Sequence, residues 1–202
     1  MIKVKICGIK TRETAIEADQ SGADFIGFIF YKKSSRFINP FKAAEIANSV
    51  NCKKVGVFVD ESPGVINGIT RLVGLDYVQL HGNEDVKFAS KIRAPIIKAW
   101  RYNAELDMRE VNNYPCDIIL LDSFVKGRVG GTGKTFDWRK ASLETRKLTK
   151  PFLIAGGISI DNVREVIDIF RPYGIDVSGS LEINGVKSAN KIREFMETVK
   201  DL

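Results

Sequence analysis

The stretch D-F-I-G-F-I-F-Y-K-K-S-S-R-F-I-N-P-F-K-A-A-E-I-A-N-S-V (residues 24–50) contains every part of one structural unit. It opens with a nearly continuous apolar run at 24–30, which is typical of a strand that is covered on its outer face in a parallel sheet. After a polar loop, Asn39 and Pro40 form a helix start, with a capping side chain followed by proline at the first helical position. The apolar residues that then recur at helical spacing are Ala43, Ile46, Ala47 and Val50. The stretch therefore predicts a strand, a loop and a helix.

The same unit recurs along the whole chain. Apolar runs predict eight strands, at residues 2–6, 24–30, 54–59, 76–80, 95–100, 117–122, 151–155 and 174–178. Helical patterns separate them, at 11–20, 40–50, 63–73, 84–92, 104–112, 137–147, 163–170 and 192–199. Strand then helix, eight times, predicts the α/β class and a (β/α)8 TIM barrel, with residues 1–202 as one domain. An open doubly wound sheet is the alternative, and eight units that end in a helix favour the closed barrel.

Composition narrows the class of protein. Hydrophobic residues make up 44% and charged residues 28% of the chain, as in ordinary globular proteins. We expect a cytoplasmic protein, because the sequence has neither a run of about 20 apolar residues nor a secretory leader. The three cysteines are odd in number and widely spaced, which indicates a reducing compartment. A single histidine and the absence of a C-x-x-C pair predict that there is no metal site.

Charge narrows the possible partners. The chain has 31 Lys and Arg against 25 Asp and Glu, a net charge of +6. There is no run of five like charges and no basic stripe interleaved with aromatic residues, so we predict no nucleic-acid partner and no membrane partner. Scattered solvated lysines explain most of the surplus, and a small anionic substrate fits the rest.

Glycine-rich turns gather at the predicted strand ends, where a TIM barrel builds its site. They follow the sixth, seventh and eighth strands, and glycine lets backbone N–H groups approach an anion closely. Each turn alone is best explained as an ordinary turn, but their position on one rim favours phosphate binding. The predicted phosphate-binding residues are Gly131, Gly133, Gly156, Gly157, Ser178 and Gly179.

Two strand ends carry groups suited to acid–base chemistry. Asp122 ends the strand I-I-L-L-D, where burial would raise the pKa of a carboxyl and make it a general acid. Cys7 ends the first strand beside Gly8, where a positive local potential would favour its thiolate as a base or nucleophile. A loop or helix-capping aspartate and a small buried hydrophobe are the plainer explanations.

Other polar residues follow the same strands. Arg36, in the loop after the second strand, has the forked donors that suit a carboxylate or phosphate, although it could instead pair with an acidic neighbour. His81 is interpreted as a structural residue near the site rather than a catalyst. Lys98, in the fifth strand, is a candidate Schiff-base amine, but a lysine reaching toward solvent at a strand end is the simpler interpretation.

Seven segments, in this order, resemble the phosphoribosylanthranilate isomerase family of tryptophan biosynthesis. They are V-K-I-C-G-I, G-F-I-F-Y-x-K-S-S-R, V-Q-L-H-G-x-E, L-L-D, G-G-T-G-K-T-F-D-W, A-G-G-I and D-V-S, between residues 2 and about 187. The chain departs from the family's usual S-S-G-V-E after the last strand, where it has Ser178-Gly179-Ser180-Leu181-Glu182. The exchange of serine and glycine predicts a change in which residue there takes positive φ.

The resemblance implies a cofactor-free isomerase that binds phosphoribosylanthranilate and carries out an Amadori rearrangement of this aminoaldose to an aminoketose. Asp122 would be the general acid that opens the ribose ring, and Cys7 the general base that removes the C2′ proton. Arg36 would hold the anthranilate carboxylate, and the backbone amides of the glycine-rich turns would hold the phosphate. Family membership leaves monomer and homodimer both open.

Three rival functions remain at this stage. A related histidine-pathway isomerase uses two aspartates, which Cys7 argues against. A Schiff-base aldolase would need Lys98 as its amine. A non-catalytic sensor of sugar phosphates would bind ligand without turnover.

Overall fold

The computed structural model describes residues 2–103, 105–122 and 138–202. Eight parallel strands form a closed barrel in chain order, with β1 hydrogen-bonded to both β2 and β8. The strands are Lys3–Cys7 (β1), Phe25–Ile29 (β2), Lys53–Phe58 (β3), Tyr77–Leu80 (β4), Ile96–Arg101 (β5), Ile118–Asp122 (β6), Phe152–Ala155 (β7) and Gly174–Val177 (β8). Closure confirms the predicted TIM barrel, and the alternative of an open sheet is wrong.

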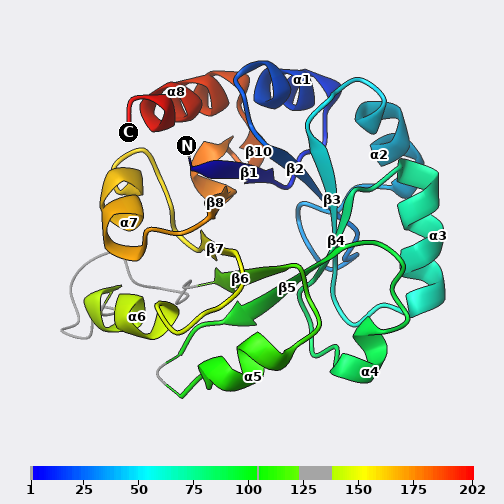
Figure 1. Ribbon diagram of the computed structural model, residues 1–202. Coiled ribbons are helices and arrows are strands. Elements are labelled where there is room, and N and C mark those ends of the chain that lie inside the picture. The colour runs from blue at the N-terminus through cyan, green and yellow to red at the C-terminus, as the bar shows by residue number, and fades with distance from the viewer. Residues whose placement is uncertain (1, 104, 123–137) are drawn as a thin grey trace.

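Helices form a ring outside the strands (Figure 1). They are Arg12–Gln20 (α1), Pro40–Ala47 (α2), Pro63–Val73 (α3), Val86–Ala89 (α4), Met108–Asn113 (α5), Trp138–Thr145 (α6), Val163–Phe170 (α7) and Ala189–Lys200 (α8). The capping predicted for α2 and α3 is present, since Asn39 accepts a hydrogen bond from Phe41 N and Ser62 from Val65 N. The same segments that carry the helical pattern therefore pack against the barrel.

Some boundaries differ from the sequence prediction. Helix α2 ends three residues before Val50, and α4 and α5 are shorter than the predicted 84–92 and 104–112. A short segment after β8 was not predicted: a 3-10 turn, Gly179–Leu181 (η1), leads into a hairpin of Glu182–Ile183 (β9) and Val186–Lys187 (β10). Two-residue strands carry too few residues to show an alternating pattern.

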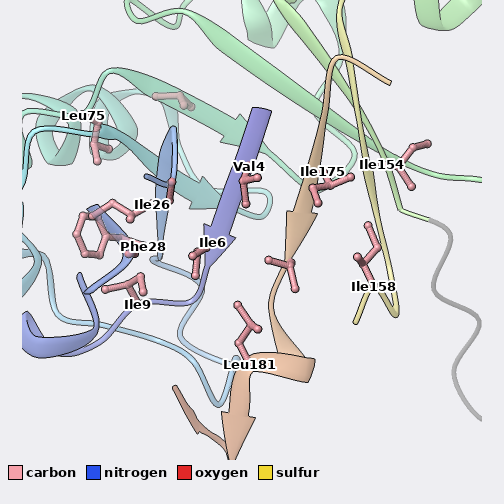
Figure 2. Packing of buried hydrophobic residues seen from close by; sticks show 14 of the residues in the cluster. Val4, Ile6, Ile9, Ile26, Phe28, Leu75, Ile154, Ile158, Ile175 and Leu181 are labelled. Atoms are coloured by element: carbon pink, nitrogen blue, oxygen red, sulfur yellow. The ribbon is translucent and has the colours of Figure 1, made fainter. Parts of the chain in front are cut away.

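Alternating side chains divide the apolar core into two layers. The larger layer fills the space between strands and helices, and Figure 2 shows its residues Val4 and Ile6 of β1 near Ile26 of β2 and Ile175 of β8. The smaller layer fills the inside of the barrel: Phe25, Val55, Ile97, Ala99, Ile118, Leu120, Leu153 and Ala155. Because β1 places Val4 and Ile6 outward, Lys5 and Cys7 face the barrel interior. Among the described residues, no helix is long and apolar enough to cross a bilayer.

Candidate active site

Cys7 and Asp122 are the last residues of β1 and β6, so both lie at the C-terminal end of the barrel. Asp122 lies two residues after Leu120 and four after Ile118, so its side chain lies with theirs on the interior face of β6. One row of paired residues crosses from β1 to β6, because Lys5 pairs with Asp176, Asp176 with Ala155, and Ala155 with Asp122. The thiol and the carboxyl therefore share one mouth of the barrel.

The Cys7 side chain is set among charged neighbours. The residue is 7% exposed, and burial raises the pKa of its thiol while the Lys5 ammonium lowers it. Gly8 N and Ile9 N both donate to the carbonyl of Gly27, at 2.9 and 3.0 Å, which fixes the turn that follows the thiol. Gly8 has φ +85°, a conformation that favours glycine. The C-G pair thus combines a reactive group with the residue that allows its turn.

Asp122 lies beside the only histidine of the chain. Its side chain is 25% exposed, and Oδ2 is 3.7 Å from His81 Nε2. The other ring nitrogen, Nδ1, lies 2.8 Å from Gln79 Nε2, which orients the imidazole. Gln79 is buried inside the barrel on the strand that ends before His81. His81 therefore borders the site and points one nitrogen at the candidate acid.

Arg36 is held by an acidic residue that sequence reasoning did not identify. Its Nε and Nη2 donate to the two carboxylate oxygens of Glu182, at 2.6 and 2.8 Å. Lys187 also donates to Glu182, and its side chain is 3% exposed. Burial would raise the pKa of Glu182, but the hydrogen bonds from Arg36 and Lys187 lower it to about 2. Nη1 of the guanidinium takes no part in the pair with Glu182, and the aliphatic part of the side chain lies against Gly8 while Nη2 lies beside Gly179.

The glycine-rich turns after β7 and β8 lie on the same rim. Gly156 and Gly157 have φ of +95° and +68°, and a Cβ added at Gly157 would meet open space. Ser178 donates from Oγ to the carbonyl of Cys7 at 2.9 Å and accepts from Lys187 at 3.3 Å, so the turn after β8 is tied to the end of β1. The predicted phosphate residues Gly131 and Gly133 lie outside the described residues.

The expectation about positive φ in the turn after β8 is wrong. None of residues 178–180 has positive φ, and Gly179–Leu181 form the 3-10 turn instead. A Cβ added at Gly179 would lie 3.4 Å from Arg36 Nη2, about van der Waals contact, so the guanidinium packs beside this turn. The order Ser-Gly-Ser therefore imposes no left-handed backbone.

Lys98 does not face the barrel interior with Cys7 and Asp122. Lys98 lies on the same face of β5 as Ile96, which packs in the outer layer. Its ammonium donates to the Glu84 carboxylate at 2.8 Å and to the Gly82 carbonyl at 2.7 Å. The side chain is 5% exposed. This arrangement gives the lysine a structural role beneath the loop after β4 and argues against the aldolase alternative.

Four charged residues near the thiol were missed at the sequence level: Lys5, Asp176, Glu182 and Lys187. A usable pattern existed for the first two, since Lys5 lies two residues before Cys7 and Asp176 two before Ser178, on the same faces of their strands. For Glu182 and Lys187 the pattern was absent, because the hairpin that carries them is too short to be recognised. Cys52 and Cys116 lie elsewhere, and burial raises the pKa of Cys52 to about 12.

A closed (β/α)8 barrel with a thiol, a carboxyl and paired cations at its C-terminal mouth has the architecture and the site position of the (β/α)8-barrel enzymes. Comparison with known proteins narrows the class. Residues 4–198 match the family model described as N-(5′-phosphoribosyl)anthranilate isomerase. The chain belongs to this family.

Individual relatives agree with the family match. The chain is 41% identical over 204 residues to the N-(5′-phosphoribosyl)anthranilate isomerase of Trichlorobacter lovleyi, covering 100% of this chain and 99% of that one. The crystal structure of phosphoribosyl anthranilate isomerase from Thermotoga maritima is 40% identical with a TM-score of 0.89, and both chains are covered completely. A further structure of such an isomerase, 38% identical with complete coverage of both chains and a TM-score of 0.87, holds reduced 1-(o-carboxyphenylamino)-1-deoxyribulose 5-phosphate.

Proposed function

We propose that Cys7 and Asp122 are the base and the acid with which this chain isomerises N-(5′-phosphoribosyl)anthranilate, the reaction of its family and a step of tryptophan biosynthesis. The observation that carries the assignment is their shared position, since both end their strands on the interior side of one barrel mouth. The phosphorylated compound bound by the related isomerase supports a substrate of the same kind here.

The acid acts first. Asp122 gives a proton to the ribose ring oxygen as the bond from that oxygen to C1′ breaks, and the anthranilate nitrogen supplies the electrons that form an iminium. A carboxyl with one side toward solvent and His81 at 3.7 Å can be reprotonated between turnovers. The ring opens without a metal ion because the nitrogen lone pair stabilises the cation.

The base acts second. The iminium withdraws electrons from C2′ and acidifies its proton, which the Cys7 thiolate removes. The electrons of the C–H bond form the C1′–C2′ double bond of an enolamine, and the iminium π electrons return to nitrogen. Tautomerisation, which moves the enol proton to C1′, then gives the ketone. A thiolate is a sufficient base for this step because the iminium has already lowered the barrier.

Binding groups surround these two residues. Arg36 is the partner for the anthranilate carboxylate, since Glu182 bonds Nε and Nη2 and orients the planar guanidinium. Backbone amides near Gly156, Gly157, Ser178 and Gly179 form the part of the phosphate site that lies on the described rim. The two substrate anions also fit the part of the basic surplus that scattered lysines leave unexplained.

Cellular setting and assembly remain predictions. All three cysteines are free, which supports a reducing cytoplasmic compartment. A sedimentation measurement would distinguish the two predicted states, monomer and homodimer.

The experiment is a comparison of four single variants. Cys7→Ser and Asp122→Asn are expected to lower kcat by about 10²-fold to 10⁴-fold, the usual contribution of a positioned acid or base. Cys116→Ser and Asp161→Asn are the matched controls, because the first is a buried thiol of the outer core layer and the second an exposed carboxyl. Binding of a reduced product analogue, measured by calorimetry, is expected to stay near the wild-type value in all four. A Cys7→Ser or Asp122→Asn enzyme with wild-type turnover would refute the corresponding role.

A further inference from the structure

The inside of the barrel contains a buried ion pair directly below the thiol. Lys5 is 0% exposed, and its ammonium donates to both oxygens of Asp176, at 2.9 and 3.0 Å. Apolar residues such as Phe25 and Ala155 pair with these two residues on the interior face. Removing two charges from water is costly, and well-packed apolar residues in place of such a pair are often as stable or more so. Stability alone therefore does not explain a lysine at this position.

The lysine also lies against the thiol. Lys5 and Cys7 are two residues apart on β1 and share the interior face. A Cβ added at Gly27 would lie 2.9 Å from Cys7 Sγ and 3.3 Å from Lys5 Nζ, so the sulfur and the ammonium border the same small space. A lysine ammonium has three N–H donors. Two of them are directed at Asp176, which leaves the third for the sulfur that borders the same space.

We propose that Lys5, held in place by Asp176, is a positioning residue that stabilises the thiolate form of Cys7. The inference rests on the proposed role of Cys7 as the base, and it adds the group that makes a buried thiol usable for that role. Lys5 acts through Cys7 and does not need to touch the substrate.

The remaining charges near the thiol favour Lys5 over other cations. Arg36 and Lys187 also act on Cys7, but they share the carboxylate of Glu182, which offsets one of their two charges. Lys5 is 0% exposed, borders the same small space as Sγ, and lowers the pKa of the thiol more than Lys187 does. Burial raises the pKa of the thiol, Lys5 lowers it, and Asp176 raises it in turn.

Asp176 faces further charges on its other side. His81 and Asp122 both act on its carboxylate, the first lowering its pKa and the second raising it. The Lys5–Asp176 pair therefore lies between the candidate base and the candidate acid. A change in the charge of Asp176 is expected to reach Cys7 through Lys5.

The test measures the thiol directly, in the absence of substrate. The rate of alkylation of Cys7 by iodoacetamide is followed against pH by mass spectrometry of the peptide that contains it, in the wild type, Lys5→Met and Asp176→Asn. Lys5→Met is expected to shift the alkylation curve toward alkaline pH and to slow the reaction at pH 7 by about tenfold, equivalent to one pKa unit. Asp176→Asn is expected to speed the reaction, because the lysine loses its competing anion.

A double variant keeps the proposal testable if Lys5→Met fails to fold because it leaves Asp176 unpaired. Lys5→Met/Asp176→Asn removes both charges together and is expected to react about tenfold more slowly than Asp176→Asn alone. Identical curves with and without Lys5 would overturn the proposal. So would a slowing of equal size in Lys5→Met and Asp176→Asn, since a purely structural role changes both in the same direction. Full activity in Cys7→Ser would refute the role of the base while leaving the alkylation result intact, so the two failures are distinguishable.

Discussion

Gly27 is the position where one methyl group tests the geometry of the site. It pairs with Cys7 in the register of β1 and β2. In Gly27→Ala the new Cβ would lie 2.9 Å from Cys7 Sγ and 3.2 Å from Cys7 Cα. Carbon atoms in contact prefer about 3.5–4.0 Å, so Cys7 has to move by roughly 0.5 Å. Rotation of the side chain does not relieve the second contact, because Cα belongs to the backbone.

The size of the effect follows from this displacement. Forcing one methyl into a packed interior costs about 1–3 kcal/mol of folding free energy. Catalysis is more sensitive, because a misplacement of about 1 Å can lower a rate about 10²-fold. We expect Gly27→Ala to lower kcat/KM by about tenfold to 10²-fold while the barrel remains folded. The assay is loss of substrate fluorescence, with urea denaturation of the same sample to measure the free energy of unfolding.

Gly68→Ala is the matched control. Gly68 lies inside α3, and a Cβ there would meet nothing within 4 Å. Alanine in place of glycine within a helix is expected to add about 0.5–1 kcal/mol of stability and to leave kcat/KM unchanged. A Gly27→Ala enzyme within twofold of the wild-type kcat/KM would show that the sulfur tolerates displacement, and the proposed geometry of the base would be wrong.

Three further substitutions test other parts of the structure. Arg36→Met is expected to raise KM more than it lowers kcat, because it leaves the substrate carboxylate unpaired at a cost of about 1–3 kcal/mol; an unchanged KM in steady-state assays would remove Arg36 from substrate binding. Glu182→Gln is expected to destabilise the protein at pH 7, and since the pKa of Glu182 is lowered to about 2, the difference from the wild type should shrink as the pH falls from about 4.5 toward 2; a difference in urea midpoint that stays constant over this range would contradict the pairing. Gly174→Ala would place a Cβ 2.6 Å from the carbonyl oxygen of Lys3, at the other end of the barrel. We therefore expect a loss of about 1–3 kcal/mol in the free energy of unfolding with kcat retained, and a wild-type urea midpoint would contradict this expectation.

The fold was predictable because its elements repeat a strong local pattern. Each strand is a short buried run, and the predicted ends differ from the observed ones by a residue or so, as in β1 at Lys3–Cys7. Helix ends were less predictable, because Val50 continues the apolar stripe of α2 although it packs after the helix has ended. Local periodicity records which residues are buried and carries less information on where hydrogen bonding stops.

The position of the candidate site was predictable where chemically reactive residues lie at strand ends. Cys7 and Asp122 end their strands, the Gly156-Gly157 turn follows one, and closure of the barrel brings them to one mouth. The partner of Arg36 was not predictable, since Glu182 is 146 residues away and belongs to a hairpin with almost no pattern of its own. The Lys5–Asp176 pair was predictable in part. The alternation of β1 places Lys5 beside Cys7, but only the barrel's closure brings Asp176 to it.

The central claim is that the thiolate of Cys7 is the base. The most direct test compares two pKa values on Asp122→Asn, in which the acid no longer titrates: that of the acid limb of the residual kcat/KM against pH, and that of Cys7 from alkylation. Because burial raises the pKa of the thiol, and a base acts in its deprotonated form, the residual kcat/KM should still be rising above pH of about 8.5, and the two pKa values should coincide. A residual kcat/KM that is already constant at pH 7, where alkylation shows Cys7 still protonated, would contradict the account.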